Sequence, residues 1–526
     1  MDLYTFLQSI ASLLMFLYIF SKLTPKNPKK NGIPEPAGSL PLIGHLHLLS
    51  EKETACKKLA TMADKCGPLF SLKLGIHRVL VVSSWEIAKD CFTTNDLTLA
   101  TRANTAGGRH MGYNNAIFAL APYGEYWRNI RKMVTIELLS SHRLEKLKHI
   151  RFSEMDYFIK DLYDLSRKGA ENCAEMVTIS EALEQFTFNI ILRMLVGKRF
   201  SGSTCADKNS EPWRYEKAIK KAIYLFGVFM LADALPGLGC VDIQGHIRSM
   251  KRTAKEVDSL ISAWLDEHLK RRKENQDTCE SDFMDVMLNH LPEETVISGH
   301  TRDTIVKATT MILTLTGGES TSVTITWALS LLLNHPNVVK AAREELEHQV
   351  GTERWVEESD IKNLKYLQAI VKETLRLYPP GPITGIREAT QDCRIAGYDV
   401  SKGTRLIVNI WKLHRDPRVW ENADLFQPER FMTTHAHLDV RGQNFVYMPF
   451  SSGRRSCPGM TFGLQVVHLT VAKLIQGFDI RTIDGMAVDM EEGLGLALPK
   501  LNPLEVVLTP RLHSELYEGL QDIKKY

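Results

Sequence analysis

The chain has 526 residues, of which 44% are hydrophobic and 24% charged, the composition of a folded globular protein rather than a disordered one. Its 65 basic and 62 acidic residues leave a formal charge of +3, too small an excess to predict a nucleic acid as the main partner. The nine cysteines are an odd number without a CxxC pair, which argues against a disulfide framework or a zinc site and favours a reducing compartment.

The N-terminal segment is the most apolar part of the chain. Residues 3–20 read LYTFLQSIASLLMFLYIF, and with the next three residues the run is long enough to cross a bilayer as a helix. Lys26, Lys29 and Lys30 follow, and the positive-inside rule places them in the cytosol. We therefore predict a membrane anchor over residues 1–24. A cleaved signal peptide is the alternative, disfavoured because no basic residue precedes the run.

The rest of the chain has the pattern of one globular unit. Residues 25–45 are rich in lysine and proline, which predicts a stiff hinge, and residues 46–526 form the predicted globular domain. Two β-rich runs, LFSLKLG (69–75) and RVLVVSS (78–84), flank a turn at Ile76 and His77 and predict a hairpin. Most of the remainder has helical periodicity. The expected fold is therefore mainly α with a small β portion.

One cysteine stands in an unusual local sequence. The stretch PFSSGRRSCPGMTF (449–462) surrounds Cys457 with glycines and arginines and leads into a long amphipathic run. Gly453 and Gly459 permit tight turns, and Arg455 is close enough in sequence to pair with an anion beside the thiol. The amides at the start of the following helix would stabilise a thiolate. A buried, inert cysteine is the ordinary alternative, and this setting favours a ligating thiolate.

The stretch resembles the FxxGxRxCxG signature of the cytochrome P-450 monooxygenases, at Phe450, Gly453, Arg455, Cys457 and Gly459. The resemblance implies that Cys457 is the axial thiolate of a haem iron, in heme b (iron protoporphyrin IX), and that residues 46–526 form a haem-thiolate catalytic domain. In the family's fold the haem lies between a long oxygen-binding helix and the cysteine loop. A thiolate ligand favours O–O cleavage. The finer match is to plant microsomal members, which include nicotine N-demethylase, fraxetin 5-hydroxylase and protopine 6-hydroxylase.

Two further motifs resemble the same family. KETLRL (372–377) holds Glu373 and Arg376 three residues apart, on one face of a predicted helix, in the pattern of the family's ExxR. Taken alone, the two residues would be a solvated surface pair. FQPERF (426–431) supplies Arg430 and resembles the family's PERF segment. The resemblance implies a buried charge network of Glu373, Arg376 and Arg430 that braces the cysteine loop.

A further motif lies in a long apolar helix predicted over residues 303–334. TGGEST (316–321) places two glycines inside it, where each costs about 1 kcal/mol relative to alanine, so we expect a close approach there. The resemblance implies that dioxygen and substrate make this approach. It also assigns Glu319 and Ser320 to the acid–alcohol pair that delivers protons, a role that Thr321 could share. Serine stands where the family usually has threonine. A core or membrane helix with polar breaks is the alternative.

Cations for the two carboxylates of haem follow from matched positions. Trp127 and Arg131 fit the family's WxxxR pattern. Arg387 and Arg455 occupy other positions where the family places partners of the propionates. Arginine suits this task because its planar fork binds a carboxylate bidentately. The resemblance therefore implies that these residues bind the cofactor together with Phe450 and Gly459 of the cysteine signature.

Electrons must come from another protein, because the sequence carries no convincing flavin or nicotinamide fingerprint. The family precedent is NADPH-cytochrome P-450 reductase, for which we predict a basic docking face that comprises Lys132, Arg143, Lys146, Lys148 and Arg151. Apolar candidate pocket walls favour a hydrophobic small-molecule substrate. The prediction is an NADPH- and O2-dependent monooxygenase with a single-pass anchor in the endoplasmic reticulum membrane and a cytosolic catalytic domain. It would hydroxylate an alkaloid, terpenoid or phenolic of plant specialised metabolism. The alternatives are an O2-independent haem-thiolate isomerase or dehydratase, and a non-enzymatic haem protein.

Overall fold

The structure is a computed structural model that describes residues 7–8, 10–12, 14–15, 32–49, 53–170, 176–200, 211–228, 230–235, 242, 245–275, 282–483 and 485–520. Its longer helices are α2 (Ala55–Cys66), α3 (Trp85–Phe92), α5 (Glu125–Glu137), α7 (Lys148–Ala170), α8 (Ile179–Val196), α9 (Glu211–Gly227), α11 (His246–Asn275), α12 (Phe283–His290), α13 (Arg302–Leu333), α14 (Pro336–Gln349), α15 (Lys365–Leu377) and α17 (Met460–Gly477).

The shorter helices are α4 (Ala106–His110), α6 (Ser141–Lys146), α10 (Leu231–Ala234), α16 (Ile410–Leu413), α18 (Ser514–Glu518), η1 (Leu46–Leu49), η4 (Ile361–Asn363), η5 (Pro428–Phe431) and η6 (Gly453–Arg455). The strands are β1 (Leu69–Leu74), β2 (His77–Val82), β3 (Thr101–Arg102), β4 (Val177–Thr178), β5 (Val296–Ile297), β6 (His300–Thr301), β7 (Arg387–Glu388), β8 (Cys393–Ile395), β9 (Tyr398–Val400), β10 (Arg405–Val408), β11 (Phe478–Arg481) and β12 (Glu505–Pro510).

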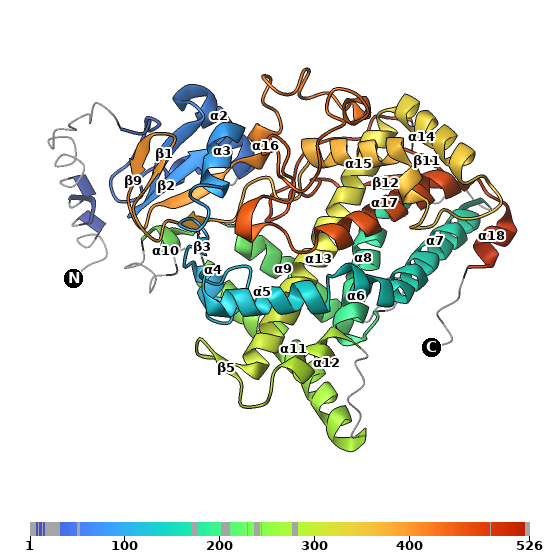
Figure 1. Cartoon of the computed structure of the whole chain (residues 1–526), viewed down its shortest axis with the longest axis horizontal. Coiled ribbons are helices and arrows are strands. Elements are labelled where there is room, and N and C mark those ends of the chain that lie inside the picture. The colour runs from blue at the N-terminus through green and yellow to red at the C-terminus, as the bar shows by residue number, and fades with distance from the viewer. Residues whose placement is uncertain are drawn as a thin grey trace.

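The largest sheet has five strands in the order β1-β2-β10-β7-β3 and lies at the left of Figure 1, near α2, α3 and α16. β1 and β2 form an antiparallel hairpin in which Leu74 pairs with His77. The predicted hairpin is therefore confirmed, with its turn one residue earlier, at Gly75 and Ile76. Gly75 has φ +60°, a left-handed conformation that glycine adopts without strain. β10 runs parallel to β2, so strands distant in sequence meet in one sheet.

α13 is the central helix of the larger, helical part (Figure 1). The Thr301 hydroxyl accepts a hydrogen bond from the Thr304 amide and caps the helix. Its 32 residues give a length of about 48 Å. α8, α11, α15 and α17 pack around it and bury most of its residues from Ile305 onward, except around Thr316–Ser320. A helix covered on all sides is apolar on all sides, which explains the long apolar run, and the helix predicted over 303–334 is confirmed within one residue.

Aromatic packing holds the C-terminal part of the chain against α13. The ring of Trp327 stacks on Tyr378 with centroids 3.9 Å apart, and its Nε1 donates to the Leu498 carbonyl across 2.7 Å. Trp327 is fully buried, and burying so large an apolar side chain stabilises the fold by about 1.5–3 kcal/mol. These contacts bring the loop of residues 494–499 to the surface of α13, where it lines the cavity described below.

The fold is mainly α with a small β portion, as the sequence predicts. Most of the predicted anchor over residues 1–24 lies outside the described residues. Within the described part of the chain, no helix combines the length and the apolar character needed to cross a membrane. The described end of the predicted hinge lies against β1, since the Ser71 amide donates to the Pro34 carbonyl across 2.8 Å and the His45 amide to the Lys73 carbonyl across 2.7 Å.

Candidate functional site

Cys457 lies in a short loop between η6 and α17, just before Gly459, the N-cap residue of α17. The Cys457 amide donates to the Phe450 carbonyl across 3.0 Å and so closes the loop on itself. Gly453 has φ +71°, and a Cβ at this position would overlap Oδ1 of Asp96. Glycine is therefore required at the first glycine of the motif, both by the turn and by the neighbouring carboxylate.

The Cys457 side chain is exposed, yet protein atoms crowd it closely. Desolvation raises the pKa of its thiol above the ordinary value, while a hydrogen bond from the Gly459 amide and the charge of Arg131 act in the opposite direction. The sulfur is therefore accessible to a ligand while protein atoms partly shield it from water. A metal ion bound to the sulfur would remove the thiol proton outright, so this setting is compatible with a thiolate ligand.

Arginines from four separate segments converge beside this loop: Arg102 of β3, Arg131 of α5, Arg387 of β7 and Arg455 of η6. Desolvation, together with the positive charge of neighbouring arginines, lowers the pKa of Arg455 to about 8 and that of Arg102 to about 9. The ring of Trp127 lies near two of them, with its centroid 5.5 Å from the guanidinium carbon of Arg131 and 4.4 Å from that of Arg455. The site therefore concentrates positive charge in a desolvated place.

Few negatively charged acceptors serve this cluster. Arg455 donates to three main-chain carbonyls, and Arg131 donates to the Ser456 carbonyl across 2.6 Å. Arg387 has Asp96 at 3.5 Å, while its buried Nε has no hydrogen-bond partner among the described residues. Desolvated guanidinium groups with carbonyl partners and an unpaired donor have capacity for further carboxylates. The two propionates of haem, with its iron at the cysteine sulfur, fit this set of residues.

The structure brings Glu373, Arg376 and Arg430 together in the interior. The Glu373 carboxylate accepts from Arg376 at 2.7 and 2.8 Å and from Arg430 at 3.3 Å. Glu373 and Arg376 are fully buried. The remaining donors of Arg376 and Arg430 bind main-chain carbonyls of residues 414–425. The network therefore holds that segment against α15, with one carboxylate serving two cations.

The two hydroxyls of the predicted proton-delivery motif differ in accessibility. Ser320 is half-buried, whereas Thr321 is 4% exposed. The Ser320 hydroxyl donates to the Thr316 carbonyl across 2.7 Å, and the Thr321 hydroxyl to the Gly317 carbonyl across 2.9 Å. Serine and threonine commonly make these bonds to the preceding turn of a helix. Ser320 therefore offers the more accessible hydroxyl of the two.

The paired glycines of α13 have a different neighbour from the one that the sequence suggests. A Cβ at Gly317 would lie 2.7 Å from Cδ1 of Ile191, and a Cβ at Gly318 would lie 3.5 Å from Cα of Phe188. Both of these residues belong to α8. The Cβ positions of both glycines therefore face the neighbouring helix and allow it to pack closely, while Gly318 also lines the cavity described next. The approach of dioxygen and substrate at these glycines stays a prediction.

Glu319 lines a cavity of about 260 Å³ between α8, α9, α13 and the loop of residues 494–499. Desolvation and the negative charge of Glu184 raise the pKa of its carboxyl to about 8, although the charge of Lys220 opposes the rise. Lys220 itself is paired with Glu184 at 2.7 Å and with Glu216 at 2.9 Å. At neutral pH Glu319 therefore holds its proton, as a group that donates protons must.

Apart from these charged residues, the cavity is lined mainly by apolar side chains. They include Phe188, Ile219, Ile223, Leu315, Leu494 and Pro499. A site of this composition takes up apolar molecules and uses its few polar groups to orient them.

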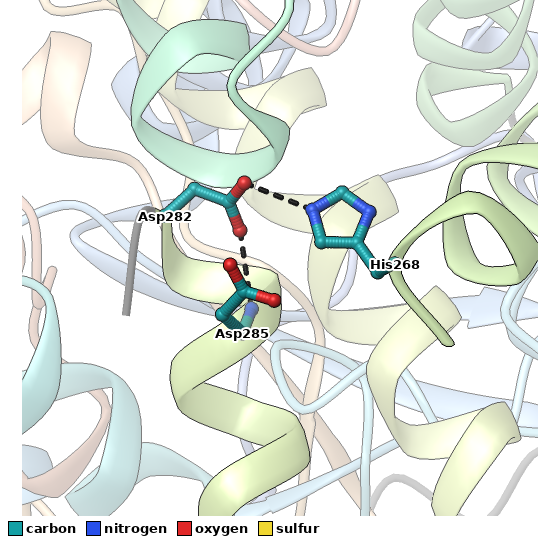
Figure 2. Close-up of side chains that lie close together, drawn as sticks. All are labelled: His268, Asp282 and Asp285. Carbon is teal, nitrogen blue, oxygen red and sulfur yellow. Dashed lines mark hydrogen bonds and ion pairs between the residues drawn. The ribbon is translucent and has the colours of Figure 1, made fainter. Parts of the chain in front are cut away.

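A second group of metal-ligand residue types lies where α11 meets α12. His268, Asp282 and Asp285 place ligand atoms within 4.8 Å of one another (Figure 2). Nδ1 of His268 lies 2.7 Å from the Trp264 carbonyl and Nε2 lies 2.8 Å from Oδ2 of Asp282. Because a carbonyl and a carboxylate only accept, both ring nitrogens carry protons, and an imidazolium cannot ligate a metal. Asp285 is paired with Arg271 at 2.6 Å. The group is therefore an ion network that joins two helices.

Two residues of the site have no motif that would indicate them in the sequence. Arg102 joins the arginine cluster because β3 pairs with β7, which sets it opposite Arg387. Asp96 accepts hydrogen bonds from the Arg454 amide at 3.2 and 3.3 Å and contacts Arg387. Both depend on contacts between segments almost 300 residues or more apart, and an isolated arginine or aspartate in a loop carries no local signal of such a contact.

The chain is similar to one protein family, to known plant proteins and to a solved structure. The family model described as Cytochrome P450 matches residues 34–505. The dimethylnonatriene synthase of Arabidopsis thaliana is 54% identical over 511 residues, which cover 97% of this chain and 97% of the relative. A xanthotoxin 5-hydroxylase of Arabidopsis thaliana is 48% identical over 96% of this chain and 98% of the relative. A nicotine N-demethylase of Nicotiana tomentosiformis is 44% identical over 97% of this chain and 99% of the relative. A zebrafish cytochrome P450 solved with progesterone has a TM-score of 0.72 at 24% identity, over 87% of this chain and 99% of that chain, which shows the fold alone.

Proposed function

The chain belongs to the cytochrome P450 family, and we propose that it hydroxylates a hydrophobic metabolite of plant specialised metabolism with NADPH-derived electrons and O2. As a cytochrome P450 monooxygenase it binds heme b and transfers one oxygen atom of dioxygen to a small-molecule substrate. Relatives named as hydroxylases and as an N-demethylase favour this activity over an O2-independent isomerase or dehydratase and over a non-enzymatic haem protein.

The observation that carries the proposal is the convergence of the Cys457 loop with arginines that are short of anionic partners. In this proposal Sγ of Cys457 ligates the iron, and Arg131, Arg387 and Arg455 bind the propionates together with Arg102. The Gly459 amide supports the thiolate by its hydrogen bond to the sulfur, and the Phe450 carbonyl holds the cysteine amide. Trp127 supports two of the arginines. Bound haem supplies the redox chemistry that activates dioxygen.

Proton delivery is assigned to α13. Monooxygenation consumes two electrons and two protons for each dioxygen, because one oxygen atom enters the product and the other leaves as water. Glu319 holds its proton below about pH 8 and serves as the proton store. The accessible hydroxyl of Ser320, which donates to the Thr316 carbonyl, passes protons onward and is recharged from Glu319. Thr321 is a second hydroxyl on the next position of the helix.

The proposed substrate class follows from the cavity and from the relatives. The walls contributed by α8, α9, α13 and the loop of residues 494–499 are mainly apolar, which suits a hydrophobic molecule. The relatives are named for dimethylnonatriene, xanthotoxin, strychnine, flavonoid and nicotine chemistry. A terpenoid, phenolic or alkaloid substrate is therefore proposed, with hydroxylation as the principal reaction.

The proposed electron donor is NADPH-cytochrome P-450 reductase, with both proteins on the cytosolic face of the endoplasmic reticulum. A single-pass anchor over residues 1–24 and a hinge over residues 25–45 would hold the catalytic domain there. The basic face predicted for docking loses one member, because Arg151 is 2% exposed and its guanidinium is bound by the carboxylate of Glu358 at 3.0 and 3.1 Å. A side chain that is buried and paired in this way cannot receive a partner protein.

The test is turnover in microsomes of yeast that expresses the full chain together with a plant reductase. A panel of terpenoids, phenolics and alkaloids is supplied, and products heavier by one oxygen atom are sought by mass spectrometry under ¹⁸O2. Cys457→Ala is the matched control, since it changes only the proposed iron ligand. Products that carry ¹⁸O, require NADPH and reductase, and are absent from the control support the proposal. Turnover that continues without NADPH or without O2 overturns it.

A further inference from the structure

His414 is a fully buried histidine outside every motif that the sequence indicates. It follows the one-turn helix α16, and both of its ring nitrogens have main-chain partners. Nδ1 lies 3.2 Å from the carbonyl oxygen of Arg376, and Nε2 lies 2.9 Å from the amide nitrogen of Met448. The imidazole thus stands between α15 and the segment that leads into the Cys457 loop.

These two partners determine the protonation state of the ring. The Arg376 carbonyl can only accept, so Nδ1 carries the proton and donates. The Met448 amide can only donate, so Nε2 is unprotonated and accepts. The ring is therefore neutral in one tautomer, and burial lowers its pKa to about 3, with the charges of Arg376 and Arg415 acting in the same direction. The link consequently persists across the whole physiological pH range.

His414 and Arg376, a member of the buried charge network, form hydrogen bonds to each other in both directions. The His414 side chain donates to the Arg376 carbonyl, and the Arg376 guanidinium donates to the His414 carbonyl across 2.9 Å. The guanidinium is in turn held by both carboxylate oxygens of Glu373. The network therefore determines the position of the imidazole, because the side chain of each of His414 and Arg376 donates to the main-chain carbonyl of the other.

The segment beyond Met448 continues directly into the Cys457 loop. The Ser451 amide donates to the Met448 carbonyl across 2.9 Å, and the Cys457 amide donates to the Phe450 carbonyl across 3.0 Å. The hydroxyl of Tyr447 donates to the Lys372 carbonyl of α15 across 2.8 Å. The start of the loop therefore has two adjacent attachments to α15, one made directly by Tyr447 and one made through His414.

From these contacts we infer that His414 is a positioning residue, through which the Glu373–Arg376–Arg430 network sets the position of the Cys457 loop. The inference rests on the proposed role of Cys457 as the iron ligand. The bond from the Met448 amide to Nε2 carries the effect, because Met448 lies on the loop's own main chain, while the bond from Nδ1 to the Arg376 carbonyl orients the ring.

Three substitutions separate the two bonds of the imidazole. His414→Phe keeps a planar ring and removes both bonds. His414→Gln places an amide oxygen near the position of Nε2 and can accept from the Met448 amide. His414→Asn has the shorter side chain, which reaches only the region of Nδ1 and can restore only the bond to the Arg376 carbonyl. Tyr447→Phe is the matched control, because it removes only the hydroxyl of the neighbouring attachment and keeps the ring that packs beside His414.

The measurements are made on purified, full-length holoenzyme with carbon monoxide as the probe. The first is the share of the dithionite-reduced carbonyl complex that shows the thiolate-type difference spectrum. The second is hydrogen exchange of the Met448 amide, followed by mass spectrometry in a peptide spanning residues 445–450. Loss of one net hydrogen bond is expected to raise this exchange rate by roughly tenfold.

The inference is supported if the Met448 amide exchanges faster in His414→Phe and His414→Asn and the thiolate-type share of their carbonyl complex is several-fold smaller. In His414→Gln and Tyr447→Phe the exchange rate of this amide should stay close to that of the wild type. Wild-type exchange and a wild-type spectrum in His414→Phe would overturn the inference, as would equal behaviour of the Gln and Asn variants. If the Phe variant yields no holoenzyme, the comparison of Gln with Asn decides alone. Failure of the wild type to give a thiolate-type spectrum is a separate result, which refutes the proposed role of Cys457 instead.

Discussion

Glu373→Gln tests the buried charge network most directly, because it preserves the shape of the side chain and removes its charge. The Glu373 carboxylate holds Arg376 through two bonds of 2.7 and 2.8 Å, holds Arg430 at 3.3 Å, and accepts from the Gln427 amide at 3.0 Å. Without the charge, two guanidinium groups remain in the interior with carbonyl partners only. Removing one partner of a buried pair costs about 3–5 kcal/mol, a large part of the total of about 5–15 kcal/mol that stabilises a typical protein.

The assay is thermal unfolding of the holoenzyme. Unfolding entropy is about 2.1 cal/mol/K per residue, or about 1 kcal/mol/K for a folded domain of this length, so the expected fall in Tm is about 3–5 °C. All variants are measured at one scan rate, because large proteins commonly unfold irreversibly and their apparent Tm depends on that rate.

Glu344→Gln in α14 is the matched control for this measurement. Glu344 is also a helical glutamate with a basic partner, Lys340 at 3.9 Å, but the two side chains are 65% and 80% exposed. An exposed pair of this kind contributes between about 0 and 1 kcal/mol, so its Tm should move by no more than about 1 °C. Equal shifts for Glu373→Gln and Glu344→Gln would refute the reasoning that burial makes the first carboxylate decisive.

Three further predictions concern the ligand, the proton store and the second ion network. Cys457→Ala should abolish the thiolate-type carbonyl difference spectrum, and a retained spectrum would disprove the assigned ligand. Glu319→Gln should lower coupled turnover by roughly 10²-fold. Wild-type turnover should decline above about pH 8, where Glu319 loses its proton. The same decline in the variant would contradict the assignment of Glu319 as the proton store. Burial lowers the pKa of His268, but the hydrogen bond to Asp282 and its negative charge outweigh this effect, so that the pKa is raised above its ordinary value. The imidazolium therefore contributes stability in full below the ordinary histidine pKa of about 6.5, and this contribution is lost as the pH rises through the raised value. The Tm difference between wild type and His268→Leu should accordingly shrink at alkaline pH, and a pH-independent difference would count against the charged ring.

Much of the candidate site is predictable from short sequence spacings. The glycines around Cys457, the three-residue step from Glu373 to Arg376, and the long apolar run of α13 are local features, and local geometry determines their consequences. Residues three apart share a helix face wherever the helix lies, and a helix with no polar stripe must be shielded from water on all sides. The mainly helical class and the β1–β2 hairpin follow for the same reason.

The tertiary structure decided which distant groups meet. It placed Arg102 opposite Arg387 through strand pairing, and it set Ile191 of α8 against the glycine that the sequence had suggested for a ligand. It also turned Arg151 into the interior, although its sequence neighbours predict a basic surface. Such contacts join segments that are far apart along the chain, and their choice depends on how whole helices and strands pack against one another. Local periodicity states which face of an element is buried, but it contains no information about the partner that buries it.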